Sequence, residues 1–306
     1  MAENITRTYT NPLVIDVADP FILEHEGIFY LYGTSAPDGI RVLSSPNLVD
    51  WTEEGMALSA KDSWGDKWFW APELTYRDGV FYMYYSVEER LAVATASHPL
   101  GPFVQEERLP ICVTTPQIDS HVFQDTDGKY YIYFVRFDEG NHVYGAVLND
   151  DMLTFDESTA VKLLSPTEPW ERTMFPVNEG PFVLKHKGLY YLTYSGDHFE
   201  SPGYGVGFAV SDKPLGPFKK YEHNPIMQSN EAVHGSGHHS FIQVSTSSGK
   251  ELFIVYHTHR SLSCVHPRVT AIDRAKFTPV DGSYDIITVH GPTTTPQPTP
   301  LANIKP

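Results

Sequence analysis

Four acidic residues and one histidine occur at comparable places in the sequence, each a few residues ahead of a glycine that opens an aromatic run. They are Asp19 in Ala-Asp-Pro, Glu73 in Trp-Ala-Pro-Glu, Asp119 in Ile-Asp-Ser, Glu179 in Asn-Glu-Gly-Pro and His238 in Gly-His-His-Ser. Carboxyl groups that come together can act as a general acid and a general base when their surroundings separate their pKa values. Carboxylates can also bind a hard cation.

A purely structural explanation exists for each residue alone, because Asp and Glu often cap backbone N–H groups at turns and strand starts. It is weaker for all five together. Gathering four carboxylates at one place costs electrostatic repulsion that a function must justify. Glycoside hydrolysis uses such an arrangement, since one carboxylic acid protonates the leaving oxygen and one carboxylate activates water.

Aromatic residues cluster directly before Glu73. They are Trp64, Trp68, Phe69 and Trp70. An aromatic face can cover the C–H face of a sugar ring, so a sugar substrate fits this cluster. Packing between structural units is the competing explanation, and it is weakest for Trp70, which adjoins the Glu73 motif. Trp70 and Glu73 are therefore predicted to bind substrate.

The elements that must position these residues repeat along the chain. Five turn glycines are each followed by an aromatic-rich alternating run: Gly27, Gly79, Gly128, Gly188 and Gly249. An apolar stretch precedes each glycine, so each pair of stretches predicts a β-hairpin. A third apolar run and a short closing segment follow in each unit. No long stretch has helical periodicity.

Units of about fifty to sixty residues with four short strands are typical of propeller blades. Five such units account for all 306 residues and leave no room for a second domain. We therefore predict an all-β fold, one five-bladed β-propeller over residues 1–306. Its Pro/Thr-rich tail, 291–306, is either an extended closing segment or a linker stub. The first strand of each blade lines the central channel, so the five candidate residues should converge at one end of it.

Composition excludes several classes of partner. The net charge is −16, which disfavours a nucleic acid or an anionic membrane surface as partner. No run approaches the roughly 18 apolar residues of a membrane-spanning helix. The N-terminal residues lack the features of a signal peptide, which leaves a cytoplasmic protein or a secreted one whose signal was removed. Cys112 and Cys264 are predicted as two buried, inert thiols, with a single bridge as the alternative.

Taken in order, these motifs resemble glycoside hydrolase family 43 over essentially the whole chain. The resemblance rests on Asp19 in Ala-Asp-Pro, Asp119 in Ile-Asp and Glu179 in Glu-Gly-Pro, with Trp-Ala-Pro-Glu between the first two. It implies a five-bladed propeller that inverts the anomeric centre. Asp19 is then the general base, Glu179 the general acid, and Asp119 the residue that orients Glu179 and keeps its pKa high.

The resemblance also implies roles beyond the three carboxylates. His238 matches a histidine that in many members contacts a central cation, often Ca²⁺, mostly through waters. An uncoordinated, hydrogen-bonded channel histidine is the alternative. Arg268 resembles an arginine that holds substrate hydroxyls, and a simple ion pair is its alternative. Ile118, beside Asp119, joins Trp70, Glu73 and Arg268 in the predicted substrate-binding set.

The function that this resemblance implies is release of pentoses by an exo-acting enzyme. The expected substrates are α-L-arabinofuranosyl or β-D-xylosyl groups on plant cell-wall oligosaccharides or polysaccharides. An endo-1,5-α-L-arabinanase is the first alternative, and a non-catalytic sugar-binding propeller is an alternative of another class. Retaining fructan hydrolases share the propeller, but their Arg-Asp-Pro element is absent around Asp119.

Overall fold

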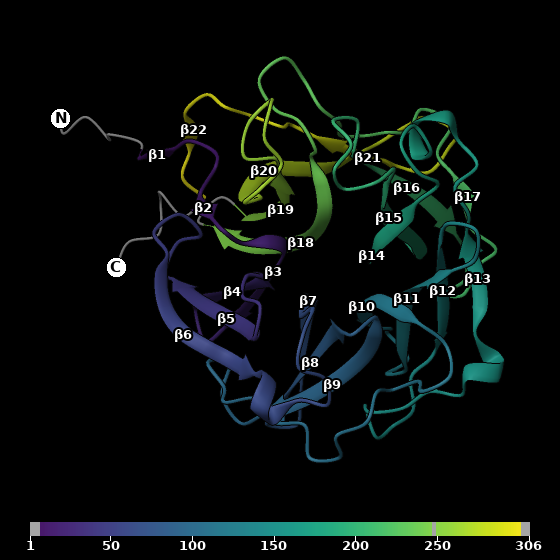
Figure 1. Cartoon of the computed structure of the whole chain (residues 1–306). Helices are drawn as coiled ribbons and strands as arrows, with labels where there is room; N and C mark the ends of the chain where they lie inside the picture. The colour runs from purple at the N-terminus through teal and green to yellow at the C-terminus, as the bar shows by residue number, and fades with distance from the viewer. Residues whose placement is uncertain (1–6, 247–248, 301–306) are drawn as a thin grey trace.

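The computed structural model describes residues 7–246 and 249–300, in which five antiparallel sheets surround a central channel (Figure 1). Blade 1 contains β3 (Ala18–His25), β4 (Ile28–Thr34), β5 (Gly39–Ser45) and β6 (Thr52–Ser59). Blade 2 contains β7 (Trp70–Arg77), β8 (Val80–Val87) and β9 (Arg90–Ala96). Blade 3 contains β10 (Gln117–Gln124), β11 (Tyr130–Phe137), β12 (Asn141–Val147) and β13 (Val161–Leu164). The predicted all-β five-bladed propeller is confirmed.

The last two blades complete the circle. Blade 4 contains β14 (Asn178–His186), β15 (Leu189–Gly196), β16 (Gly205–Ser211) and β17 (Lys219–Lys220). Blade 5 contains β18 (Gly237–Thr246), β19 (Gly249–Thr258) and β20 (Val269–Thr278). Only three single turns of 3₁₀ helix occur in the described residues: η1 (Ala60–Asp62), η2 (Glu157–Thr159) and η3 (Pro169–Glu171). No helix among them is long and apolar enough to cross a membrane.

Both ends of the chain contribute to closure of the ring at blade 5. The N-terminal β2 (Val14–Ile15) pairs with the start of β20, and β21 (Ile286–Val289) pairs with its end. A further pair, β1 (Thr8–Tyr9) with β22 (Gln297–Pro298), joins the two ends directly. Part of the predicted tail thus pairs as an extended segment, and residues 301–306 lie outside the described residues.

Two sequence predictions need correction. Blade 2 has three strands in its sheet rather than four, because its closing segment makes only the single bridge Thr95 with Val104 to β9. The second concerns the thiols. Both cysteines are free, but only Cys112 is buried, whereas Cys264 is exposed. Cys264 falls in the connection between β19 and β20, outside the regular strands that the repeat pattern describes.

The aromatic runs of the second strands pack between blades. Five apolar clusters fill the five interfaces between neighbouring blades. Buried tyrosines in these strands also donate hydrogen bonds to main-chain carbonyls of adjoining segments. The pairs are Tyr32 to Pro99 (2.5 Å), Tyr84 to Met152 (2.7 Å), Tyr133 to Pro214 (2.7 Å) and Tyr191 to Asp285 (2.8 Å). A buried phenol requires such an acceptor, which explains why these positions carry Tyr as well as Phe.

Each first strand has a β-bulge near its leading end. The register of β3, β7, β10, β14 and β18 against the next strand shifts there. At each bulge one residue has left-handed backbone geometry: Asp19 (φ 50°), Ala71 (φ 44°), Asp119 (φ 55°), Gly180 (φ 53°) and His238 (φ 43°). Only glycine adopts this geometry without strain, so four strained residues at one recurring place indicate a functional site.

Candidate active site

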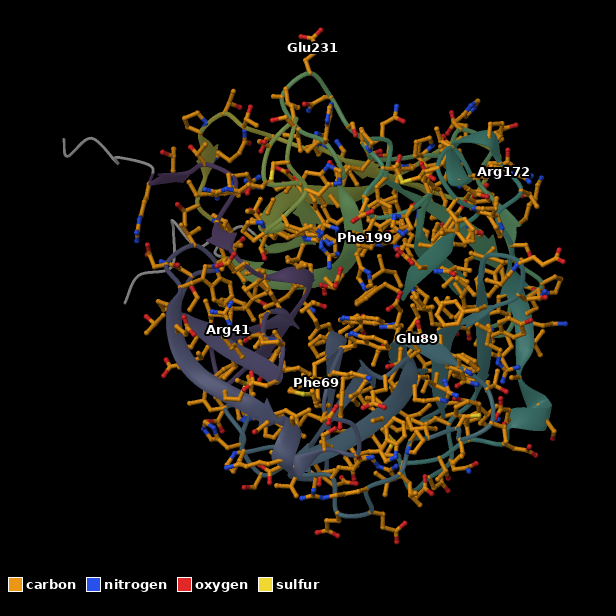
Figure 2. The ribbon with its side chains drawn as sticks, viewed as in Figure 1. Arg41, Phe69, Glu89, Arg172, Phe199 and Glu231 are labelled. Atoms are coloured by element: carbon orange, nitrogen blue, oxygen red, sulfur yellow. The ribbon has the colours of Figure 1, made fainter. Side chains whose placement is uncertain are left out.

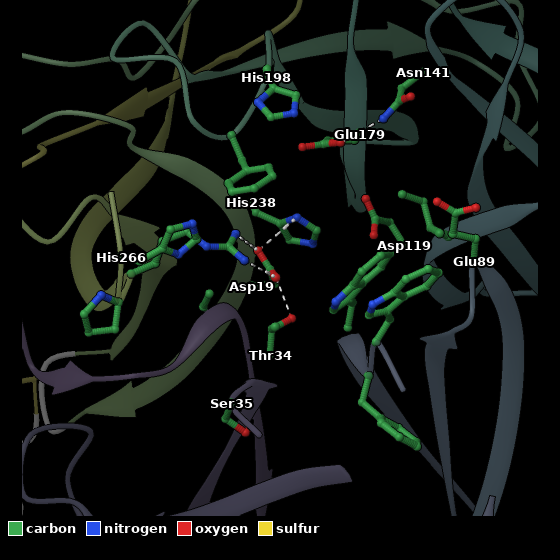
Figure 3. Close-up of a pocket in the computed structure, with 18 of the residues that line it drawn as sticks. Asp19, Thr34, Ser35, Glu89, Asp119, Asn141, Glu179, His198, His238 and His266 are labelled. Atoms are coloured by element: carbon green, nitrogen blue, oxygen red, sulfur yellow. Dashed lines mark hydrogen bonds and ion pairs between the residues drawn. The ribbon is translucent and has the colours of Figure 1, made fainter. Parts of the chain in front are cut away.

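A pocket of about 1410 Å³ opens at the bulged ends of the first strands. Asp19, Asp119 and Glu179 line it from blades 1, 3 and 4, and Figure 3 shows their carboxyl groups around a common space. All three side chains are buried, with exposed fractions of 6%, 6% and 9%. Figure 2 places Phe199, another lining residue, near the centre of the ring and Arg172 and Glu231 at its periphery.

The five predicted positions are not equivalent in the structure. Asp19, Asp119 and His238 are themselves bulge residues, but Glu179 precedes the bulge residue of its blade. Glu73 lies two residues beyond the bulge residue of blade 2 and is not among the residues that line the large pocket. Its carboxylate pairs with Nδ1 of His121 at 2.6 Å, in the channel below. The prediction that Glu73 occupies the common position at the pocket is therefore wrong.

The bulges are held by side chains of the preceding blade. The backbone N–H of Ala71 donates to Thr34 Oγ1 (3.0 Å), that of Asp119 to Ser86 Oγ (3.0 Å), and that of His238 to Ser195 Oγ (2.8 Å). Each acceptor is one of the last two residues of the second strand of the neighbouring blade, so the residues of the site are fixed across blade boundaries.

The remaining two positions both involve catalytic candidates. In blade 3 the corresponding residue is Val135, which has no side-chain acceptor, and the N–H of Gly180 donates to Asp119 Oδ2 instead (3.3 Å). In blade 5 the acceptor is Nδ1 of His257, which takes the N–H of Asp19 (3.2 Å) and also lies 3.1 Å from its carboxylate. These two positions therefore supply contacts to two of the three carboxyl groups.

Asp19 is held as an anion. Arg268 donates to both carboxylate oxygens, at 2.7 Å and 3.2 Å, and Thr34 Oγ1 donates to Oδ2 at 2.5 Å (Figure 3). Nδ1 of His257 and of His238 lie 3.1 Å and 3.4 Å from Oδ1. Burial alone would raise the pKa of Asp19, but Arg268, His238 and His257 together hold it well below the ordinary value. An ionised carboxylate of this kind can accept a proton from water.

The surroundings of Glu179, in contrast, favour its protonated form. Burial raises its pKa to about 7, with a further contribution from the charge of Asp19, although hydrogen bonds from Tyr204 and Asn141 oppose the increase. Tyr204 donates to Oε1 at 2.9 Å and Asn141 to Oε2 at 3.0 Å. Burial and the charge of Glu179 also raise the pKa of Asp119 well above its ordinary value. Glu179 can therefore remain protonated near neutral pH and donate that proton.

The pocket walls are aromatic and cationic. Trp70 is half-buried and stacks on the exposed Trp68, with ring centroids 5.9 Å apart. The guanidinium of Arg268 lies 4.6 Å from the ring of Phe199, so it is held between that ring and Asp19. Ile118 also lines the pocket, as predicted for a substrate-binding residue. Such walls can enclose a sugar ring by stacking and by donating to its hydroxyls.

The channel below the pocket bears on the predicted Ca²⁺. In the part of the chain that the structure describes, no three His, Cys, Asp or Glu side chains are grouped to coordinate a metal directly. The channel cavity is lined by His238, Glu73 and Asp119 among others. Beside it, Ser120 Oγ and His239 Nδ1 are buried without a hydrogen-bond partner. These groups fit a cation that keeps its own waters, and His238 among them lies beside the carboxylate of Asp19. A bound cation would add positive charge beneath the acidic residues.

The sequence pattern missed four residues that hold the carboxyl groups. Thr34, Asn141, Tyr204 and His257 come from second and third strands or the loops between them. Only the repeat itself could have suggested Thr34 and His257, since both lie near the end of a second strand, opposite the residue before a bulge. Nothing in the sequence pattern marks Asn141 or Tyr204.

Comparison with known proteins identifies the family of the chain. The profile of Glycosyl hydrolases family 43 matches residues 9–283. The chain belongs to this family. One similar protein, the Beta-D-galactofuranosidase xynD of Aspergillus niger, is 29% identical over 286 residues, covering 85% of this chain and 79% of the relative.

Two other similar proteins extend the comparison. The extracellular exo-alpha-(1->5)-L-arabinofuranosidase of Streptomyces avermitilis is 25% identical over 280 residues; the match covers 82% of this chain but only 56% of that longer protein. The crystal structure of an endo-1,4-beta-xylanase from Bacteroides thetaiotaomicron superposes with a TM-score of 0.86 and 37% identity, covering 94% of this chain and 98% of the other. The chain thus shares its family and its fold with glycosidases.

Proposed function

We propose that the protein is an inverting, exo-acting glycoside hydrolase that releases α-L-arabinofuranosyl or β-D-xylosyl groups from hemicellulose or pectin side chains and from oligosaccharides. The observation that carries the proposal is that the surroundings of two carboxyl groups in one pocket shift their pKa values in opposite directions. Asp19 is held ionised by Arg268, and Glu179 has a pKa raised to about 7. A sugar-binding propeller without catalysis would have no use for this difference.

In the proposed reaction, Asp19 accepts a proton from a water molecule whose oxygen attacks the anomeric carbon. The bond from that carbon to the leaving oxygen breaks at the same time, and Glu179 donates its proton to this oxygen. Asp119 accepts a hydrogen bond from the N–H of Gly180 and lies beside Glu179, whose position it supports. Exchange of protons with water then restores an ionised Asp19 and a protonated Glu179.

Substrate selection is proposed from the pocket walls and from the relatives. Trp70 offers a face for one sugar ring, and Arg268 lies at the pocket surface beside Asp19, where it can also donate to a hydroxyl group. Two of the similar proteins bear names of enzymes that act on furanosides, and the third is named as an enzyme that acts on xylan. A pentose-containing polysaccharide of the plant cell wall suits all of these features.

An endo-acting arabinanase is the second candidate, because the pocket of about 1410 Å³ exceeds the space that one pentose needs. Product analysis on linear arabinan and on xylo-oligosaccharides separates the two modes. Release of monosaccharide alone from the first minutes supports the exo mode, whereas early di- and trisaccharides support the endo mode.

Substitution of the two working carboxyl groups tests the proposal. Glu179→Gln should lower kcat by about 10³-fold or more on 4-nitrophenyl pentosides, and should lose less on 2,4-dinitrophenyl pentosides, whose leaving group needs no proton. Asp19→Asn should be nearly inactive on both substrates, because the attacking water still lacks its base. If both variants turn over like the wild type, the proposed pair is wrong.

A further inference from the structure

His257 is a buried residue with a side chain unlike those at the matching places of the other blades. It is the penultimate residue of β19 and lies opposite the residue before a bulge, where the other blades carry Thr34, Ser86, Val135 and Ser195. The hydroxyl groups among these accept from a backbone N–H of the next blade, and Nδ1 of His257 likewise accepts from the N–H of Asp19 (3.2 Å). The imidazole is longer, is completely buried, and extends to the carboxylate of Asp19.

The two ring nitrogens of His257 face different partners. Nε2 lies 3.4 Å from Nη1 of Arg268. Nδ1 accepts from the backbone N–H of Asp19 at 3.2 Å and lies 3.1 Å from Oδ1 of the same residue. One ring therefore contacts both members of the Arg268–Asp19 pair.

The packing around the ring keeps it in this orientation. Tyr204 stacks on His257 with ring centroids 5.7 Å apart and an interplanar angle of 15°. The hydroxyl of Tyr204 donates to Glu179, so the same tyrosine contacts the general acid and supports the residue behind the general base. His257 does not line the pocket, and it has no direct access to a substrate there.

We propose that His257 is a positioning residue for the hydrolytic reaction. It fixes the carboxylate of Asp19 and the guanidinium of Arg268 in the one arrangement that directs Asp19 at the attacking water. The inference rests on the proposed function, since it assumes that Asp19 is the base. Misplacement of a catalytic group by about 1 Å can cost 10²-fold in rate. The effect should therefore fall on kcat.

Three substitutions separate the two ring contacts. Asn places its amide near the position of Nδ1, whereas Gln places its amide near the position of Nε2, and Ala removes both contacts. His257→Asn should retain kcat within about tenfold, because a side-chain amide that can accept from the N–H of Asp19 remains. His257→Gln and His257→Ala should lose about 10- to 100-fold in kcat on a 4-nitrophenyl pentoside, with KM changed less than about threefold.

A double-substitution cycle shows whether the loss acts through Asp19. If it does, His257→Gln should reduce the residual rate of Asp19→Asn less than twofold. The matched control is His186→Asn, which alters another imidazole–carboxylate pair, formed with Asp285 outside the pocket. It should lower the melting temperature and leave kcat within about twofold of the wild type.

The outcomes distinguish this inference from the proposed function. If Asp19→Asn turns over normally, the proposed function fails. If Asp19→Asn is inactive but folded His257→Gln has wild-type kcat, only the role of His257 is wrong. The role is also wrong if His257→Asn and His257→Gln lose kcat equally, or if the loss from His257→Gln persists in full on the Asp19→Asn background.

Discussion

The hydroxyl of Tyr204 offers the sharpest test of how the general acid is tuned. It donates to Glu179 Oε1 at 2.9 Å and stabilises the ionised carboxylate, so it lowers a pKa that burial raises to about 7. Tyr204→Phe removes this bond but keeps the ring that stacks on His257. The ionised form of Glu179 then loses a stabilising contact, and its pKa must increase.

The size of the shift follows from the strength of the lost bond. A hydrogen bond to a charged group contributes about 1.5–3 kcal/mol, and one pKa unit corresponds to about 1.4 kcal/mol. The protonated acid can still accept from the tyrosine, so only the difference between the two states counts. We therefore expect the lower end of the range, an increase of about one unit.

The assay is the pH dependence of kcat/KM on an aryl pentoside, which reports the pKa values of the free enzyme. Activity requires protonated Glu179, so the wild-type rate should decline as pH increases through about 7, and that of Tyr204→Phe through about 8. The acidic side of the profile, set by Asp19, should not move. Tyr84→Phe, which removes another buried phenol that donates to Met152 O, should leave both sides unchanged. An alkaline side that stays fixed or moves to lower pH in Tyr204→Phe would refute the assignment.

Three other predictions test the base, the aromatic wall and the cation. Arg268→Met should move the acidic side of the pH profile upward by about one unit or more, because it removes the largest of the charges that lower the pKa of Asp19; an unmoved acidic side contradicts this. Trp70→Ala should raise KM by roughly tenfold through lost stacking, whereas Trp64→Ala, in the core between blades 1 and 2, should lower the melting temperature without changing KM. Exhaustive chelation should lower kcat and the melting temperature, and added Ca²⁺ should restore both; values unaffected by chelation would leave His238 a merely structural residue.

Much of the fold was accessible from the sequence because each blade repeats the same hairpin with the same turn glycine. The tyrosines in those hairpins also recur because each must find an acceptor on an adjoining segment. The position of Asp19 and Asp119 at the channel followed from the same repeat. Blade 2 broke the pattern, since its closing segment makes one bridge instead of a fourth strand.

The bulges could not be predicted, and they explain the error over Glu73. Counting residues back from a turn glycine assumes a regular strand, whereas each bulge inserts a left-handed residue that changes which side chains face the pocket. The bulge residues in blades 1, 2 and 5 are Asp19, Ala71 and His238, which share no side-chain chemistry. Tyr204 and Asn141 reach Glu179 from outside the first strand, so only tertiary packing brings them to the site.

The stereochemistry of hydrolysis tests the central claim most directly, because it depends on whether Asp19 activates water or attacks the sugar. Proton NMR of the first product from a 4-nitrophenyl β-D-xyloside, recorded before mutarotation, should show α-xylose. A 4-nitrophenyl α-L-arabinofuranoside should likewise give the β anomer first. A first product with the configuration of the substrate would show that a covalent intermediate forms and would contradict the account of Asp19 as a general base.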